Sequence, residues 1–136
     1  MTTITFSDIK IYLDAIASKT GIDMSGTRHK SFWNISYANF ISGNIPNVTS
    51  RGNPIPIGNP IPIINQTTPL ESSFYLILID TNGFCGIRQM PGGGPFITDT
   101  SYQIILPDGS ALTGQQIKDN IKSWLSNGFP ETLPIT

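Results

Sequence analysis

The spacing of hydrophobic and polar positions predicts one amphipathic helix near each end of the chain. In the first, over residues 8–19, apolar residues recur about one helical turn apart, which places them on one face. Ser7 can cap the start of this helix, and Gly21 can end it, because glycine readily adopts the left-handed conformation that closes many helices. The apolar stripe consists of Ile9, Tyr12, Leu13 and Ile16.

The predicted helix near the C-terminus has stronger signals. Thr113 and Gln116 are spaced as in a capping box and mark its start. Gly128 is placed to end the helix, and Pro130 prevents its continuation. The apolar positions between these limits again share one face: Ile117, Ile121, Trp124 and Leu125.

Two shorter helices are expected between these. Ser36 can cap residues 37–42, with Gly43 as the stop. Residues 68–71, Thr-Pro-Leu-Glu, have the form of a capping box with proline at the first helical position. The apolar run 74–79 that follows is also typical of a buried strand, and the capping signal favours the helix.

A short β-hairpin is expected before the last helix. Residues 102–106 and 110–112 have strand character, and Pro107-Asp108-Gly109 between them is a typical turn sequence. The length of 136 residues suits one domain, so residues 1–136 are expected to form a single unit. The predicted fold class is mainly α, with about four helices, long loops rich in proline and glycine, and this hairpin.

The hexapeptide GNPIPI occurs twice in immediate succession, at residues 52–57 and 58–63. Its prolines lack backbone donors and favour extended conformations in the preceding residues, so residues 50–66 are expected to form an extended loop. One interpretation is a duplication tolerated in a surface loop, since each doubling of loop length costs only about 0.6 kcal/mol. Another is a ligand for an aromatic groove that accepts proline-rich segments. In polyproline II geometry the two copies would present matching faces, with these candidate partner contacts: Ile55, Ile57, Ile61 and Ile63.

Composition excludes several classes of function. Charged residues make up 12 % of the chain and the formal net charge is -1, so no basic field attracts a nucleic acid. No window approaches the roughly 20 apolar residues that span a bilayer, and no signal peptide is evident. The chain as written is expected to be cytoplasmic, with export by another route left open. Cys85 is the single cysteine, which excludes an intramolecular disulfide and four-thiolate metal sites.

Several landmarks, read in order, resemble a cytochrome-c-like domain. The segments that carry the resemblance are SDIKIYLDAI, HKSFWNISYANFISGNIP, PIPIIN, PLESSFYLIL, RQMPGGGPF and LTGQQIKDNIKSWLSNGFPE. Such domains are found in large bacterial multidomain proteins and beside tyrosinase-type copper oxidases. The resemblance covers most of residues 6–131 and implies a cytochrome-c-like helical bundle. It also implies that the second GNPIPI copy takes the place of the family's single extended segment, and that the first copy is the additional one.

The chain departs from this family at the haem attachment motif. Residues 20–30, TGIDMSGTRHK, contain no cysteine where haem-bearing members carry Cys-x-x-Cys-His, so covalent haem attachment is impossible. Met90 stands where such domains have their axial methionine, and His29 lies in the general neighbourhood of the missing motif. This pair could hold haem without a covalent bond. The favoured expectation is instead that bulky side chains fill the vacated space: Phe32, Trp33, Phe40 and Phe96.

Few residues qualify as metal or anion ligands. His29, Cys85 and Met90 are among the ligand types that monovalent copper prefers, although Cys85 and Met90 are also typical packing residues. Gly92, Gly93 and Gly94 could form an amide nest for an anion or, more simply, a tight turn. No phosphate-binding lysine follows these glycines.

These observations favour a non-catalytic binding or accessory module with no resident cofactor and with a protein as its partner. The resemblance adds a copper oxidase as one such partner. Its contact surface would be the repeat and the turn from Met90 to Phe96, including Gly92, Gly93 and Gly94. One alternative is a redox or metal-handling protein that uses His29 and Met90. Another is a small enzyme whose site converges only in three dimensions, with these candidates: His29, Asp99 and Asp108.

Overall fold

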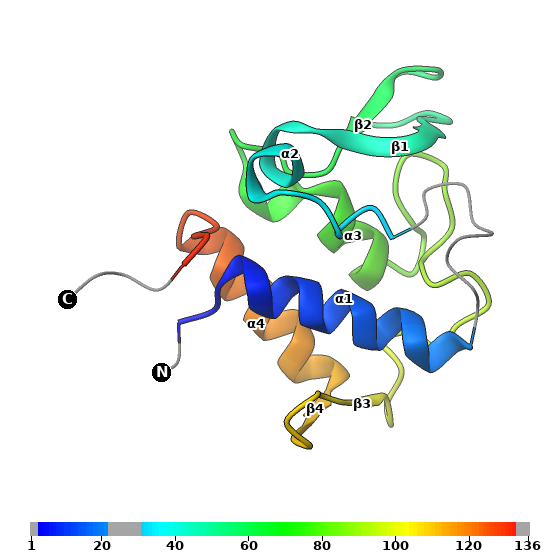
Figure 1. Ribbon diagram of the computed structural model, residues 1–136. Coiled ribbons are helices and arrows are strands. Elements are labelled where there is room, and N and C mark those ends of the chain that lie inside the picture. The colour runs from blue at the N-terminus through cyan, green and yellow to red at the C-terminus, as the bar shows by residue number, and fades with distance from the viewer. Residues whose placement is uncertain (1–2, 22–30, 133–136) are drawn as a thin grey trace.

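The computed structural model describes residues 3–21 and 31–132, which form four α-helices and two small antiparallel sheets (Figure 1). The prediction of a mainly α, cytochrome-c-like bundle is therefore wrong, because the described residues make a small mixed α/β fold. Figure 1 places the two sheets at opposite ends of the view, with helices between them. Among the helices of the described residues, none has the length and apolarity needed to cross a membrane.

Helix α1 (Phe6–Thr20) begins two residues earlier than predicted. Its N-cap is Thr5, whose hydroxyl accepts a hydrogen bond from the backbone of Asp8, while the Asp8 carboxylate accepts one from the Thr5 backbone at 3.0 Å. This reciprocal capping box satisfies two free backbone donors and so prevails over a cap at Ser7, which lies inside the helix. Gly21 ends the helix as predicted, with a φ of 72°.

Helix α4 (Gly114–Ser126) has the predicted capping box. The Thr113 hydroxyl accepts from the Gln116 backbone at 3.1 Å, and the Gln116 side chain accepts from the Thr113 backbone at 2.9 Å. Helices α1 and α4 contribute to one hydrophobic core, and the backbone of Phe6 donates to the Pro130 carbonyl at 3.1 Å. The two terminal segments of the described chain therefore meet.

The two short helices are also present. Helix α2 (Tyr37–Ser42) is capped by Ser36, as predicted. Helix α3 (Ser73–Ile79) confirms that the apolar run is helical, but its entry differs from the prediction. A 3-10 turn (Pro69–Glu71) precedes it, and Thr68 makes no side-chain cap. The Glu71 backbone donates to the carbonyl of Thr68 at 2.8 Å rather than to its hydroxyl, and the side chain of Asn65 accepts from the backbone at residues 67 and 68.

Strands β1 (Asn44–Thr49) and β2 (Pro60–Pro62) pair antiparallel, with Asn44 opposite Pro62 and Thr49 opposite Pro60. This sheet was not predicted from the sequence, because the prolines of β2 cannot donate hydrogen bonds. The donors come from flanking residues instead: Ser50 donates to the Asn59 carbonyl at 2.9 Å, and Ile63 donates to the Gly43 carbonyl at 3.0 Å. Proline is tolerated in β2 because this strand has a neighbour on one side only.

The position of β2 divides the tandem repeat. The second copy contains β2, whereas the first copy forms the connection between the two strands. Near the C-terminus, β3 (Gln103–Ile105) and β4 (Ala111–Thr113) confirm the predicted hairpin before α4.

Candidate functional site

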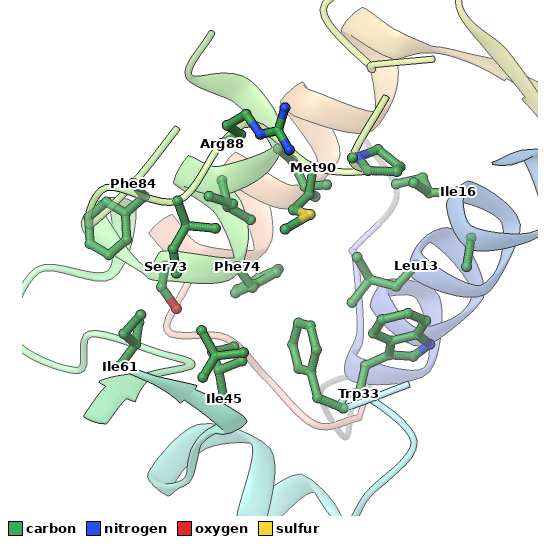
Figure 2. A pocket seen from close by; sticks show the side chains of 18 of the residues that line it. Leu13, Ile16, Trp33, Ile45, Ile61, Ser73, Phe74, Phe84, Arg88 and Met90 are labelled. Carbon is green, nitrogen blue, oxygen red and sulfur yellow. The ribbon is translucent and has the colours of Figure 1, made fainter. Parts of the chain in front are cut away.

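A cavity of about 520 Å³ opens between α1, α3 and the β1–β2 sheet, and the chain from residue 84 to residue 92 lies along its edge (Figure 2). Most side chains of its described wall are apolar. Figure 2 shows that they come from different parts of the chain and face a common space. Those that define this space are Leu13, Ile16, Trp33, Ile45, Ile61 and Phe74.

The α1 side of the pocket is fixed by helical periodicity and by one hydrogen bond. Ile16 and Ala17 follow Leu13 by three and four residues and therefore share a face of α1 with it. The buried ring of Trp33 lies beside them, and its Nε1 donates to Oδ1 of Asp14 at 2.6 Å. This bond holds the indole against α1 and gives its N–H donor a hydrogen-bond partner.

The opposite side of the pocket is held by Ser73, at the start of α3. Its hydroxyl donates to the carbonyl of Pro62 at 2.6 Å, which joins α3 to β2. Ile61, in the middle of β2, is 2 % exposed and lines the pocket. The second repeat copy is therefore part of the pocket wall.

A tight turn at Phe84–Ile87 forms the edge of the pocket. The backbones of Phe84 and Ile87 exchange two hydrogen bonds of 2.9 Å, and both central residues have positive φ, 55° at Cys85 and 77° at Gly86. This is the geometry of a two-residue type I′ hairpin. The Cys85 carbonyl accepts from the backbone of Arg51 at 2.8 Å, so the turn is attached to the segment that follows β1.

Met90 lies on the pocket wall, where the resemblance had suggested an axial ligand. Its backbone donates to the Ile77 carbonyl at 2.9 Å, and the buried side chain of Gln89 beside it donates to the Leu78 carbonyl at 2.9 Å. These bonds fix residues 89–90 against α3. Figure 2 shows the sulfur of Met90 facing the space between Phe74 and Leu13.

Two arginines, Arg51 and Arg88, supply the charge of the pocket. No Asp, Glu, His or Cys is found among the described residues of its wall. Both arginine side chains are exposed, and neither makes a hydrogen bond or ion pair through its guanidinium group with any described residue. The described pocket is thus apolar inside and positive at its rim.

The predicted metal ligands do not converge in the described residues. His29 lies outside them. Cys85 is buried and lines a second, open cavity with Asn53 and Asp80, whereas Met90 lines the apolar pocket. Within residues 3–21 and 31–132 no group of three or more His, Cys, Asp or Glu could hold a metal ion.

The two carboxylates considered for acid-base chemistry stabilise their own turns. Asp99 accepts from the Phe96 backbone at 2.8 Å. Asp108 accepts from the hydroxyl of Ser110 at 2.6 Å and from its backbone at 2.9 Å, and these hydrogen bonds lower the pKa of Asp108. Neither carboxylate lines the apolar pocket.

The candidate partner contacts are split between surface and core. Ile57 is 79 % exposed and Ile55 is half-buried, whereas Ile61 and Ile63 are buried. The predicted matching faces of the two copies are therefore not formed. In the turn after Met90, Gly92 and Gly93 are exposed, and Gly94 and Phe96 are half-buried.

The expected filling of a vacated haem space by aromatic side chains stays a prediction, and a cavity lies beside Met90. Phe32 and Trp33 form part of its wall rather than its filling. Phe40 is fully buried in the core, in contact with Phe74 and Trp124, and Phe96 lies outside that core.

The pocket itself was missed by the sequence analysis. Leu13 and Ile16 belong to a stripe that looks like any core-facing stripe, and nothing in their spacing shows that the space opposite is empty. Comparison of the chain with family models, with curated proteins and with solved structures finds no match. The resemblance to cytochrome-c-like domains therefore stays a prediction.

Proposed function

We propose that this chain is a non-catalytic binding protein whose pocket between α1, α3 and the β1–β2 sheet accepts a small apolar molecule. The observation that carries the proposal is the cavity of about 520 Å³ with its mostly apolar wall. Pockets that bind small molecules commonly have volumes of about 300–1,000 Å³ and walls of this composition.

The pocket is preorganised by hydrogen bonds that lie in its frame. Trp33 is bound to Asp14, Ser73 to the Pro62 carbonyl, and the Met90 backbone to the Ile77 carbonyl. A ligand therefore gains from apolar burial, about 25 cal/mol per Å², without having to order the wall.

A protein partner remains part of the proposal. Ile57, in the connection between β1 and β2, is 79 % exposed and so is accessible to a partner. Gly92 lies both on the surface and at the pocket wall, so a partner at this turn would adjoin the pocket. A copper oxidase is the partner that the resemblance suggests.

The second candidate is a redox or metal-handling protein that binds haem or copper through His29 and Met90. The position of the Met90 sulfur, facing into the pocket, favours it. Soft metals accept thioether ligands, but one thioether holds a metal weakly, so this function depends on His29. An absorbance spectrum with metal analysis, after incubation with haem and with copper, tests this second function. A Soret band or stoichiometric copper would support it, and the absence of both would rule it out.

The apolar pocket is tested with N-phenylnaphthylamine, an uncharged dye whose fluorescence rises in apolar surroundings. We expect saturable binding to the unmodified protein. Ala17→Phe places a large ring on the pocket wall and should weaken binding at least about tenfold, since the ring occupies part of the space that the dye needs.

Ala111→Phe is the matched control, because Ala111 is exposed in β4 and does not line the pocket. Circular dichroism confirms that both variants fold. Absence of saturable binding, or equal binding by all three proteins, would overturn the proposed function.

A further inference from the structure

We propose that the ligand of this pocket is an amphipathic carboxylic acid, whose apolar chain lies in the cavity and whose carboxylate binds Arg51 and Arg88. The inference rests on the proposed function and names the chemical class of its ligand. The described wall has an apolar interior and, at its rim, two cations without a partner among the described residues, which is complementary to a molecule with one apolar part and one anionic end.

The two arginines are brought together by the turn at residues 84–87. The backbone of Arg51 donates to Cys85 within this turn, and a Cβ built on Gly86 would lie 2.8 Å from Cβ of Arg51. Arg88 follows the turn directly, and Figure 2 shows its guanidinium beside Met90. Both side chains therefore originate at the same edge of the pocket.

The charge at this edge is not neutralised by the described protein. Neither guanidinium has a hydrogen-bond or ion-pair partner in the described residues, and the described wall contains no carboxylate. Both arginines line the pocket, so both attract an anion bound there. A guanidinium group can donate two parallel hydrogen bonds to one carboxylate, and these bonds are charge-assisted. The arginines should therefore bind a carboxylate more strongly than a neutral head group.

The other cations of the described chain are placed differently. Nζ of Lys10 lies 5.2 Å from the centre of the Phe6 ring, and Nζ of Lys19 lies 5.3 Å from that of Tyr102. Arg51 and Arg88 are the only arginines among the described residues, and both line the pocket.

The test compares three molecules that share one chain and differ at its end: laurate, lauryl alcohol and laurylamine. Isothermal titration with the full chain should show the tightest binding for laurate and the weakest for laurylamine, which the arginines repel. Added salt should weaken the binding of laurate and leave that of the alcohol unchanged, because screening acts on charge.

Arg51→Gln and Arg88→Gln should each raise the Kd for laurate about threefold to tenfold, and the double variant more, since each exposed cation contributes modestly. Neither change should affect the alcohol. Lys122→Gln is the matched control, because it removes one positive charge from an exposed position on α4 that does not line the pocket.

The outcomes separate the two proposals. If laurate and the alcohol bind equally and the arginine variants bind laurate as the unmodified protein does, the carboxylate inference is overturned and the apolar pocket stands. If laurate binds more weakly than the alcohol, the inference is also overturned. If none of the three molecules binds, and the uncharged dye also fails, both proposals are overturned.

Discussion

The two copies of GNPIPI have the same sequence and opposite environments. In the first copy Ile57 is 79 % exposed, whereas its counterpart in the second copy, Ile63, is 0 % exposed. Ile55 is half-buried, and its counterpart Ile61 is 2 % exposed and lines the pocket. The comparison shows that these six residues do not determine their own structure. Their neighbours in the fold decide it.

Each copy accepts a hydrogen bond from the hydroxyl of one serine. Ser73 of α3 donates to the carbonyl of Pro62 and holds the second copy against the core. Ser50 donates to the carbonyl of Ile55 at 2.6 Å and folds the first copy back on the end of β1. Only the second copy pairs with β1, so only the second copy is built into the sheet and the pocket.

The largest contrast should come from shortening one isoleucine in each copy. Ile63→Ala removes a fully buried side chain, which should lower the free energy of unfolding by about 2–5 kcal/mol. Ile57→Ala alters an exposed side chain and should change it by less than about 0.5 kcal/mol. Urea denaturation measures both, and equal shifts would contradict the assignment of the two copies to core and surface.

Removing the serine hydroxyls should have a smaller effect that is again unequal. Ser73→Ala leaves the Pro62 carbonyl without this donor beside the core and should cost about 1–3 kcal/mol. Ser50→Ala should cost less, because it releases a connection rather than the pocket wall.

Hydrogen exchange provides the local measurement for these two serine variants. In Ser50→Ala the Gly58 amide, which donates to the carbonyl of residue 50, should exchange faster, while the amide of Ile63 stays protected. In Ser73→Ala the amide of Ile63 should exchange faster. A reversed pattern would show that the serines do not hold the copies as described.

A small effect is also expected from deleting one copy. Deleting residues 52–57 or 58–63 yields the same chain, and the remaining copy can take the place of β2. In the full chain the Ser50 backbone donates to the carbonyl of Asn59, which precedes β2. In the shortened chain only Arg51 and one glycine would separate this serine from the asparagine, and two-residue hairpin loops are common.

We expect the shortened chain to fold, to unfold at a free energy within about 1 kcal/mol of the full chain, and to keep its affinity for N-phenylnaphthylamine. Loss of folding, or loss of dye binding in a folded chain, would mean that the first copy contributes to the pocket or the core.

The elements that the sequence predicted well are those with local signals. Helix α4 could be placed from Thr113 and Gln116, and α2 from Ser36, because a cap and the helix that it starts are adjacent in the chain. The start of α1 was misplaced because Thr5 and Ser7 both suit an N-cap, and only the bond with Asp8 distinguishes them.

The rest of the fold depends on contacts between distant residues. The pairing of β1 with β2 needs donors that flank prolines, and the difference between Ile57 and Ile63 cannot be read from two identical hexapeptides. The pocket depends on where α1, α3 and the sheet leave space, and Leu13 would have the same sequence pattern if that space were filled.

The most direct test of the apolar pocket is a titration of isoleucine Cδ1 methyl groups by nuclear magnetic resonance. Aromatic rings of N-phenylnaphthylamine shift the resonances of methyl groups beside them. The account predicts saturable shifts at the isoleucines of the pocket wall and unchanged resonances at the exposed Ile57 and Ile105. The expected set is Ile16, Ile45, Ile61, Ile77 and Ile87. Shifts confined to Ile57 and Ile105, or no shifts at any isoleucine, would contradict it.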